Sequence, residues 1–257
     1  MPNAVAIIPA RFDSTRFPGK PLSTLNGKIL IQHVYDHASD AKLVDSVLVA
    51  TDDQRIFEAV TSFGGKVVMT SGNHESGTDR IAEAAAGIEC EIVVNVQGDE
   101  PFIRPEMIDD VVDLLYNDTK ASISTLATKI TGDDDINSPN VVKVVVDDNG
   151  FALYFSRSPI PYYRDDWKDL GDVAYNADDT VIFKHIGIYG YRKDDLLKFS
   201  SMPQGRLENI EKLEQLRALA CGMKIKVKET EFDTFGIDTI DDLRKAESSF
   251  KAELSDA

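Results

Sequence analysis

Apolar runs and amphipathic stretches alternate through the first half of the chain. The stretch at residues 29–42 places Ile31, Val34, Tyr35 and Ala38 at helical spacing, which predicts an amphipathic helix. Further helices are predicted at residues 54–63, 78–86 and 105–116. Strands are predicted for the apolar runs at residues 4–9, 44–50, 66–69 and 92–96. Continuous apolar strands that alternate with helices are typical of a parallel sheet with helices on both faces.

The second half of the chain has a different pattern. Strands that are longer, or that alternate apolar and polar residues, are predicted at residues 121–129, 141–147, 152–155, 183–191 and 225–228. A turn at residues 146–151 predicts an antiparallel hairpin. Helices are predicted at residues 207–221 and 239–254. The acidic segment 162–180 is predicted to be irregular, as a dimerisation or lid segment, within one α/β domain that carries an antiparallel insertion.

Composition narrows the classes of protein to which this chain of 257 residues can belong. Its formal net charge of -16 argues against the basic face that nucleic-acid binding needs. Apolar runs stay well below the roughly 20 residues that span a bilayer, and the N-terminus lacks the features of a signal peptide. The two cysteines, Cys90 and Cys221, lack the spacing of metal ligands and predict buried thiols in a reducing cytoplasm.

A cationic loop follows the first predicted strand and carries Arg11, Arg16 and Lys20 against one acid, Asp13. In so acidic a chain this local reversal of charge predicts a polyanion site, for which a nucleoside triphosphate fits best. Arg16 can hold phosphate oxygens with paired hydrogen bonds, and Lys20 suits a leaving group that gains negative charge. The loop matches neither the P-loop nor the dinucleotide-binding glycine motif. A solvated turn with scattered charges remains the alternative.

Two aspartates, Asp99 and Asp238, are candidate ligands of a divalent cation. Asp99 follows the strand predicted at residues 92–96, where a carboxylate is a rigidly held oxygen ligand beside phosphates. A polar turn at a strand end is the commoner explanation of such an acid, and Asp238 is most simply the N-cap of the last helix. Both alternatives stay open, because both aspartates can lie at the carboxyl edge of the sheet.

Three further groups have a structural and a functional explanation. Ser76, Gly77 and Thr78 begin a predicted helix and form either a plain cap or a loop that recognises a pyrimidine. His185 lies in an alternating strand, where a single histidine is more often structural. A solvated face is the simplest interpretation of the polar residues that share one side of the helix predicted at 207–221, Glu208, Glu211 and Gln215.

Eight motifs follow one another along the chain. They are Ile8-Pro9-Ala10-Arg11 with Ser14-Thr15-Arg16-Phe17-Pro18-Gly19-Lys20-Pro21-Leu22, Ala50-Thr51-Asp52-Asp53, Ser76-Gly77-Thr78-Asp79-Arg80, Val94-Asn95-Val96-Gln97-Gly98-Asp99-Glu100-Pro101, Tyr154-Phe155-Ser156-Arg157, His185-Ile186-Gly187-Ile188-Tyr189-Gly190-Tyr191, Leu213-Glu214-Gln215-Leu216-Arg217 and Gly236-Ile237-Asp238-Thr239. Together they resemble the 3-deoxy-manno-octulosonate cytidylyltransferases, or CMP-Kdo synthetases, over essentially the full length. Chance could produce one such motif but not the ordered set.

The resemblance implies a fold and a set of site residues. The fold would be a mostly parallel, Rossmann-like nucleotidyltransferase sheet, with a nucleotide-binding core at about 1–120 and 220–257 and a sugar-binding and dimerisation part at about 121–219. Catalytic residues would be Arg16, Lys20, Asp99 and Asp238, the two aspartates as ligands of Mg²⁺. Contacts to CTP would come from Ala10, Arg11, Ser76, Gly77, Thr78, Arg80 and Gln97. The sugar acid would be bound by Arg157, His185, Tyr189, Glu214 and Gln215.

The resemblance also implies a reaction. CMP would pass from CTP to 3-deoxy-D-manno-octulosonate (Kdo) by in-line displacement of pyrophosphate, in a cytoplasmic homodimer that serves lipopolysaccharide biosynthesis. The residues indicate no general base. The residues Gln204-Gly205-Arg206, which precede the helix predicted at 207–221, differ from those in many relatives. They would lie near the sugar site, so the 8-amino analogue of Kdo is an alternative acceptor. Another sugar acid, or a non-catalytic nucleotide-binding protein, are the remaining alternatives.

Overall fold

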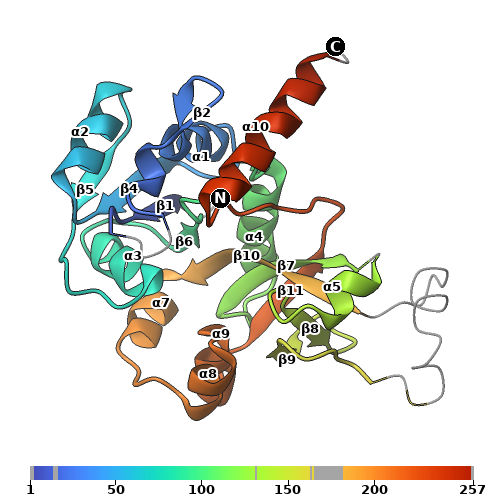
Figure 1. Ribbon diagram of the computed structural model, residues 1–257. Coiled ribbons are helices and arrows are strands. Elements are labelled where there is room, and N and C mark those ends of the chain that lie inside the picture. The colour runs from blue at the N-terminus through green and yellow to red at the C-terminus, as the bar shows by residue number, and fades with distance from the viewer. Residues whose placement is uncertain (1–2, 14–16, 131, 163, 165–181, 256–257) are drawn as a thin grey trace.

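The computed structural model describes residues 3–13, 17–130, 132–162, 164 and 182–255 (Figure 1). Arg16 and most of the segment 162–180 lie outside these residues. The strands of the main sheet are β1 (Ala4–Ala10), β4 (Ser46–Thr51), β5 (Val67–Met69), β6 (Ile92–Asn95), β7 (Ile123–Lys129), β8 (Lys143–Val146), β9 (Ala152–Ser156), β10 (Phe183–Arg192) and β11 (Ile225–Glu229). A small separate sheet pairs β2 (Thr24–Leu25) with β3 (Lys28–Ile29), just after the 3₁₀ turn η1 (Lys20–Leu22).

The main sheet has the strand order β11-β7-β10-β6-β1-β4-β5 within the described residues. The neighbours β6, β1, β4 and β5 are parallel, which confirms the prediction from their continuous apolar runs. Strand β10 runs antiparallel to both β6 and β7, and β8 and β9 form the predicted hairpin beside it. The sheet is therefore parallel where the first half of the chain builds it and mixed where the second half joins.

Helices cover both faces of the sheet. On β1, Ala6 and Ile8 face the core that α1 (Leu30–Ser39), α2 (Gln54–Ser62) and α4 (Pro105–Asn117) cover. Val5 and Ile7 face the opposite core, which α3 (Gly77–Ala86), α7 (Lys193–Ser200) and α9 (Gln215–Ala220) cover. The helix α10 (Ile240–Ser255) extends away from the sheet at the upper right of Figure 1. No helix in the described part of the chain has the length and apolarity to cross a bilayer.

The second half contains helices that were not predicted from the sequence pattern. The helix predicted at residues 207–221 is two helices, α8 (Arg206–Glu211) and α9, because Lys212 between them takes the left-handed conformation with φ 53. The helices α5 (Asp133–Asn137) and α7 were not predicted. Only Leu196 and Phe199 of α7 are buried, so its amphipathic pattern is weak.

The thiols also differ from the prediction. Cys90 is partly buried and Cys221 is exposed. Cys221 is exposed because it ends α9, where the chain turns away through Gly222 at φ 79.

Gly98 lies where the loop after β6 crosses the end of β1. A Cβ atom at this position would lie 2.9 Å from the carbonyl oxygen of Pro9 and 3.4 Å from Ile31 Cδ1. We expect Gly98→Ala to lower the free energy of unfolding by about 1–3 kcal/mol, because the backbone of β1 must move. Urea unfolding measures the effect, with Gly87→Ala as control, since nothing lies within 4 Å of a Cβ there. Equal stability of both variants would contradict this packing.

Candidate active site

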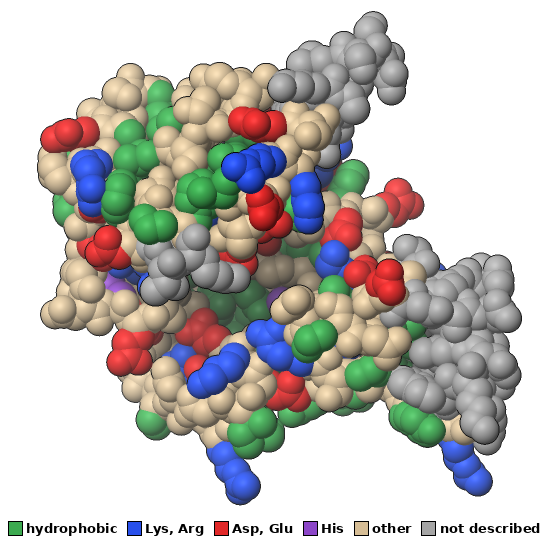
Figure 2. Space-filling view, in the orientation of Figure 1, with side chains coloured by type: hydrophobic (Ala, Val, Ile, Leu, Met, Phe, Trp, Pro, Cys, Tyr) green, Lys and Arg blue, Asp and Glu red, His purple; other side chains and the backbone are tan. Residues whose placement is uncertain are grey.

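The carboxyl ends of the parallel strands meet at a polar cleft of about 280 Å³. Its lining comes from four distant segments of the chain: Pro9, Ala10, Arg11, Lys20, Pro21, His74, Glu75, Ser76, Gly77, Arg80, Gln97, Gly98, Asp99 and Asp238. Figure 2 shows a hollow across the middle of the molecule with cationic and anionic side chains on its rims. Because β1 lies next to β6, the loops that follow these two strands share this edge of the sheet.

The cationic loop is held at its two ends. Gly19 donates its N–H to the Phe12 carbonyl oxygen at 2.9 Å, and its φ of 72 suits glycine. The Phe12 ring lies under the Arg55 guanidinium, 3.3 Å from its centroid. Arg11 lines the cleft from an exposed position. The predicted phosphate contact Arg16 lies outside the described residues.

Lys20 joins the two aspartates that the sequence left ambiguous. Its ammonium group donates to Asp99 Oδ2 at 2.7 Å and to Asp238 Oδ1 at 3.2 Å, and its side chain is 13 % exposed. The Ile237 N–H donates to the Asp99 carbonyl oxygen at 2.8 Å, which joins the two loops. The cap of α10 is formed by Thr239, whose Oγ1 accepts from the N–H of Asp242 at 3.2 Å. The N-cap interpretation of Asp238 is therefore wrong.

The aspartate pair suits a hard divalent cation. Mg²⁺ in proteins is commonly held by one or two carboxylates and completes its shell with water and substrate phosphates. Among the described residues no cluster of three or more His, Cys, Asp or Glu side chains offers a cage of protein ligands. The donor set of Asp99 and Asp238 therefore fits a cation that is shared with a phosphate-bearing ligand.

Glu100 follows Asp99 in the same motif, and no role is predicted for it from the sequence. Burial and the neighbouring negative charge of Asp99 raise the pKa of the Glu100 carboxyl to about 8. Its Oε1 lies 3.6 Å from the place where a Cβ on Gly187 of β10 would stand. At neutral pH a carboxyl with such a pKa is mostly protonated and adds little to the negative charge of the cleft.

The start of α3 forms the opposite wall of the cleft. Ser76 is its N-cap and accepts the N–H of Asp79 at 3.1 Å, which confirms the capping interpretation. Gly77 lies against the ring of Pro9, where a Cβ would be 3.4 Å from Pro9 Cγ. Thr78 Oγ1 donates to Glu214 Oε2 at 2.5 Å. The cap thus presents the positive end of a helix to the cleft while Thr78 ties it to α9.

Arg80 lines the same wall, but the protein engages its guanidinium. It is 4 % exposed and donates to Asp52 Oδ2 at 2.8 Å and Thr70 Oγ1 at 2.6 Å. Asp52 belongs to the motif after β4, where the sequence allows it as a cap of α2, but the cap is Asp53. Arg80 therefore fixes the loops after β4 and β5 at the edge of the cleft.

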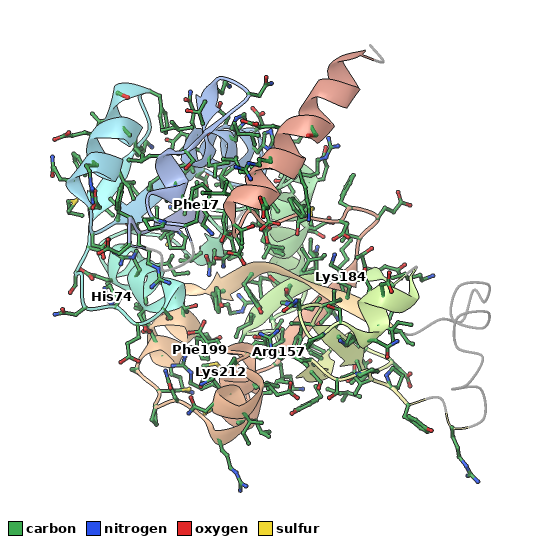
Figure 3. All side chains as sticks on the ribbon, viewed as in Figure 1. Phe17, His74, Arg157, Lys184, Phe199 and Lys212 are labelled. Carbon is green, nitrogen blue, oxygen red and sulfur yellow. The ribbon has the colours of Figure 1, made fainter. Side chains whose placement is uncertain are left out.

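Of the residues expected to bind the acceptor, His185 and Tyr189 lie together on β10. His185 Nε2 lies 3.0 Å from Thr125 Oγ1, and its ring is 5.3 Å from that of Tyr189. Arg157 instead donates to backbone carbonyls, from Nε to Glu211 at 2.7 Å and from Nη1 to Pro139 at 2.7 Å. Arg157 and Lys212 are labelled close together in Figure 3, and Arg157 Nη2 donates to the Lys212 carbonyl oxygen at 3.4 Å.

The break at Lys212 separates the polar residues predicted to share a solvated face. Glu211 accepts from Ser156 Oγ at 2.7 Å and from the N–H of Arg157 at 2.9 Å. Glu208 and Gln215 are buried, 7 % and 8 % exposed. The solvated-face interpretation is therefore wrong, because two short helices turn these side chains inward in different directions.

Burial lowers the pKa of His185 to about 3. The unfolded chain takes up a proton below pH 6.5 that the folded protein refuses, so stability falls as pH decreases through this window. Between pH 7 and pH 5 we expect wild type to lose about 2 kcal/mol more unfolding free energy than His185→Gln. Denaturant unfolding at both pH values measures this difference, and parallel losses would contradict a His185 ring that stays neutral in the folded protein.

Comparison with known proteins gives one consistent result. The family model described as Cytidylyltransferase matches residues 5–225. The 3-deoxy-manno-octulosonate cytidylyltransferase of Pelobacter propionicus is 53 % identical over 250 residues, covering 97 % of this chain and 98 % of the relative. That of Thermodesulfovibrio yellowstonii is 55 % identical over 251 residues, covering 95 % and 96 %.

Solved structures agree with this result. A CMP:2-keto-3-deoxy-manno-octonic acid synthetase in complex with CTP has a TM-score of 0.89 at 43 % identity, covering 98 % of this chain and 99 % of that one. A 4-diphosphocytidyl-2C-methyl-D-erythritol synthase from Anaerococcus prevotii, 16 % identical with a TM-score of 0.63 over 97 % and 96 % of the chains, shares the fold. With the family match and the relatives above, these findings show that the chain belongs to the cytidylyltransferase family and, within it, to the 3-deoxy-manno-octulosonate cytidylyltransferases.

Proposed function

We propose that this chain transfers CMP from CTP to Kdo and releases pyrophosphate. The observation that carries the proposal is the meeting of Lys20, Asp99 and Asp238 at the carboxyl edge of the sheet, opposite the capped start of α3. This edge combines a cation, a carboxylate pair and a helix N-terminus, which are the groups that a metal-bound nucleoside triphosphate requires.

The proposed division of labour is supported by the residues that line the cleft and, for Arg16, by the motif in which it stands. Arg11, Arg16 and Lys20 hold the triphosphate, and Lys20 neutralises the charge that develops on the departing pyrophosphate. The nucleoside is held by residues of the β1 and β6 ends and of the α3 cap, Ala10, Ser76, Gly77, Thr78, Arg80 and Gln97. Mg²⁺ held by Asp99 and Asp238 supplies Lewis-acid polarisation of the phosphoryl oxygens.

The acceptor is proposed to lie between β10 and α9. The polar wall of this subsite is formed by His185, Tyr189, Glu214 and Gln215, and Arg157 supports it from the residue that follows β9. Burial lowers the pKa of His185, so its ring is neutral and binds hydroxyl groups rather than a negative charge. Burial raises the pKa of Tyr189, which keeps its phenol protonated as a hydrogen-bond donor.

The experiment is a pyrophosphate-release assay with CTP and Mg²⁺. Kdo, 8-amino-Kdo and a sialic acid serve as acceptors in separate reactions, because the acceptor subsite determines the substrate. We expect release with Kdo and much less with the sialic acid. A higher kcat/KM with 8-amino-Kdo would identify that sugar as the acceptor, and the absence of release with every acceptor would overturn the enzymatic proposal.

We also propose that the active form is a cytoplasmic homodimer that supplies lipopolysaccharide biosynthesis. An apolar depression of about 500 Å³ on the β8–β9 hairpin supports a second copy, and Leu153 within it is 62 % exposed. The depression is lined by Val145, Val146, Leu153, Tyr154, Ile160 and Pro161. Sedimentation should give a dimer for wild type and a monomer for Leu153→Glu, and a monomeric wild type would contradict the assembly.

A further inference from the structure

Arg217 lies at the centre of a buried ionic cluster that no step proposed so far uses. It is 5 % exposed on α9 and contacts two carboxylates, Glu214 Oε1 at 2.8 Å and Glu208 Oε1 at 3.1 Å. Its Nη1 donates to the Met202 carbonyl oxygen at 3.0 Å, and its guanidinium lies 4.5 Å from the centre of the Phe199 ring. These contacts hold the guanidinium plane in one orientation.

Glu214 uses its two oxygens for different parts of the molecule. Oε1 accepts from Arg217 on its own helix, whereas Oε2 accepts from Thr78 Oγ1 at the start of α3. Thr78 belongs to the wall proposed to hold the nucleoside, and Glu214 belongs to the subsite proposed for the acceptor. One carboxylate therefore connects the two halves of the site, and its orientation depends on the group that holds Oε1.

The second carboxylate of the cluster is held independently. Glu208 Oε2 accepts from the N–H of Gly205 at 2.8 Å, which anchors it to the start of α8. Arg217 therefore binds one fixed acid, Glu208, and one functional acid, Glu214. Nη2 contacts both carboxylates while Nη1 donates to the Met202 carbonyl oxygen, so the planar guanidinium holds its partners in fixed directions.

We infer that Arg217 is a positioning residue for the transfer reaction, which turns the Glu214 carboxylate toward Thr78 and so couples the acceptor subsite to the nucleoside wall. The inference rests on the proposed function. Without Arg217, Glu214, whose side chain is 30 % exposed, loses its charged partner and its fixed rotamer. It then contacts neither the acceptor nor Thr78 in the required geometry. The loss should appear mainly as a higher KM for the acceptor.

The test is a double-mutant cycle between Arg217 and Glu214, read as the KM for Kdo and kcat in the pyrophosphate-release assay. We expect Arg217→Met to raise this KM about tenfold or more. Combined with Glu214→Gln it should be no worse than Glu214→Gln alone, because Arg217 acts through Glu214. Arg217→Lys keeps the positive charge but lacks the planar guanidinium. We expect it to raise the KM for Kdo while its melting temperature stays near that of wild type. This variant replaces Arg217→Met in the test if the Met variant does not fold.

Arg244→Met is the matched control. Arg244 forms the same i,i+3 helical pair with Asp241 at 2.8 Å, but both side chains are exposed. The KM of Arg244→Met for Kdo should stay within about twofold of wild type. Losses that multiply in the double variant, or an unchanged KM in Arg217→Lys, would overturn the inference while wild type still turns over. A wild type that releases no pyrophosphate with any acceptor would instead overturn the proposed function, and the inference with it.

Discussion

Asp99→Asn is expected to lower kcat/KM for CTP by about 10²–10³-fold at saturating Mg²⁺. The substitution removes one of the two anionic ligands proposed for the cation and weakens the 2.7 Å contact with the Lys20 ammonium. An amide oxygen has no full charge, so excess metal cannot restore the binding of the transition state. Pyrophosphate release with CTP and Kdo measures the effect.

Asp36→Asn is the control for the loss of a carboxylate near a lysine. Asp36 contacts Lys28 at 2.7 Å on the surface, with side chains 38 % and 51 % exposed. An exposed pair of this kind contributes little, so kcat/KM should remain near that of wild type. Near-normal turnover of Asp99→Asn at saturating Mg²⁺ would show that the cation is not held by this pair.

Arg80→Met is expected to lower the free energy of unfolding by about 3–5 kcal/mol. The substitution leaves Asp52, 23 % exposed, without the guanidinium that contacts it at 2.8 Å, and leaves Thr70 without its 2.6 Å donor. Because these contacts fix the loops after β4 and β5, the loss is one of stability as well as of CTP binding. Urea unfolding in the absence of nucleotide separates the two effects.

The double variant Arg80→Met with Asp52→Asn tests the cause of this loss. Removing the uncompensated charge should recover about 1 kcal/mol or more relative to Arg80→Met alone. If instead Arg80→Met unfolds at the same urea concentration as wild type but binds CTP weakly, Arg80 acts on the nucleotide and not on the fold.

The parallel half of the fold could be predicted because its signals are local. Strands β1 and β6 are buried on both faces, so a run of apolar residues such as Ala4–Ala10 identifies each of them. The helices of the second half were predicted less accurately. An amphipathic pattern continues through Lys212, and nothing in the neighbouring residues shows that its φ is positive. Helix α7 was missed because charged residues fill half of its length.

The active site also depends on contacts between residues far apart in the sequence, which local patterns do not predict. Local reasoning favoured a cap for Asp238, because an acid just before a helix is usually one. Residues 20, 99 and 238 come together only through the adjacency of β1 and β6 and through the contact of Ile237 with Asp99. Arg217 stands in a motif quoted from the sequence, but its contacts depend on the break between α8 and α9. The order of the motifs identified the family. Only the contacts of the folded chain show that Arg11 is exposed at the cleft, whereas the Arg80 guanidinium is bonded to Asp52 and Thr70.

The position of Asp238 after the last strand has a consequence for proteolysis. Strand β11 ends at Glu229, so a cut between Glu229 and Asp238 removes no strand of the sheet. Lys20 and Asp99 keep their contact after such a cut, but the second carboxylate of the pair is no longer covalently joined to the sheet. Cation binding is therefore expected to be lost to a protease before the sheet is.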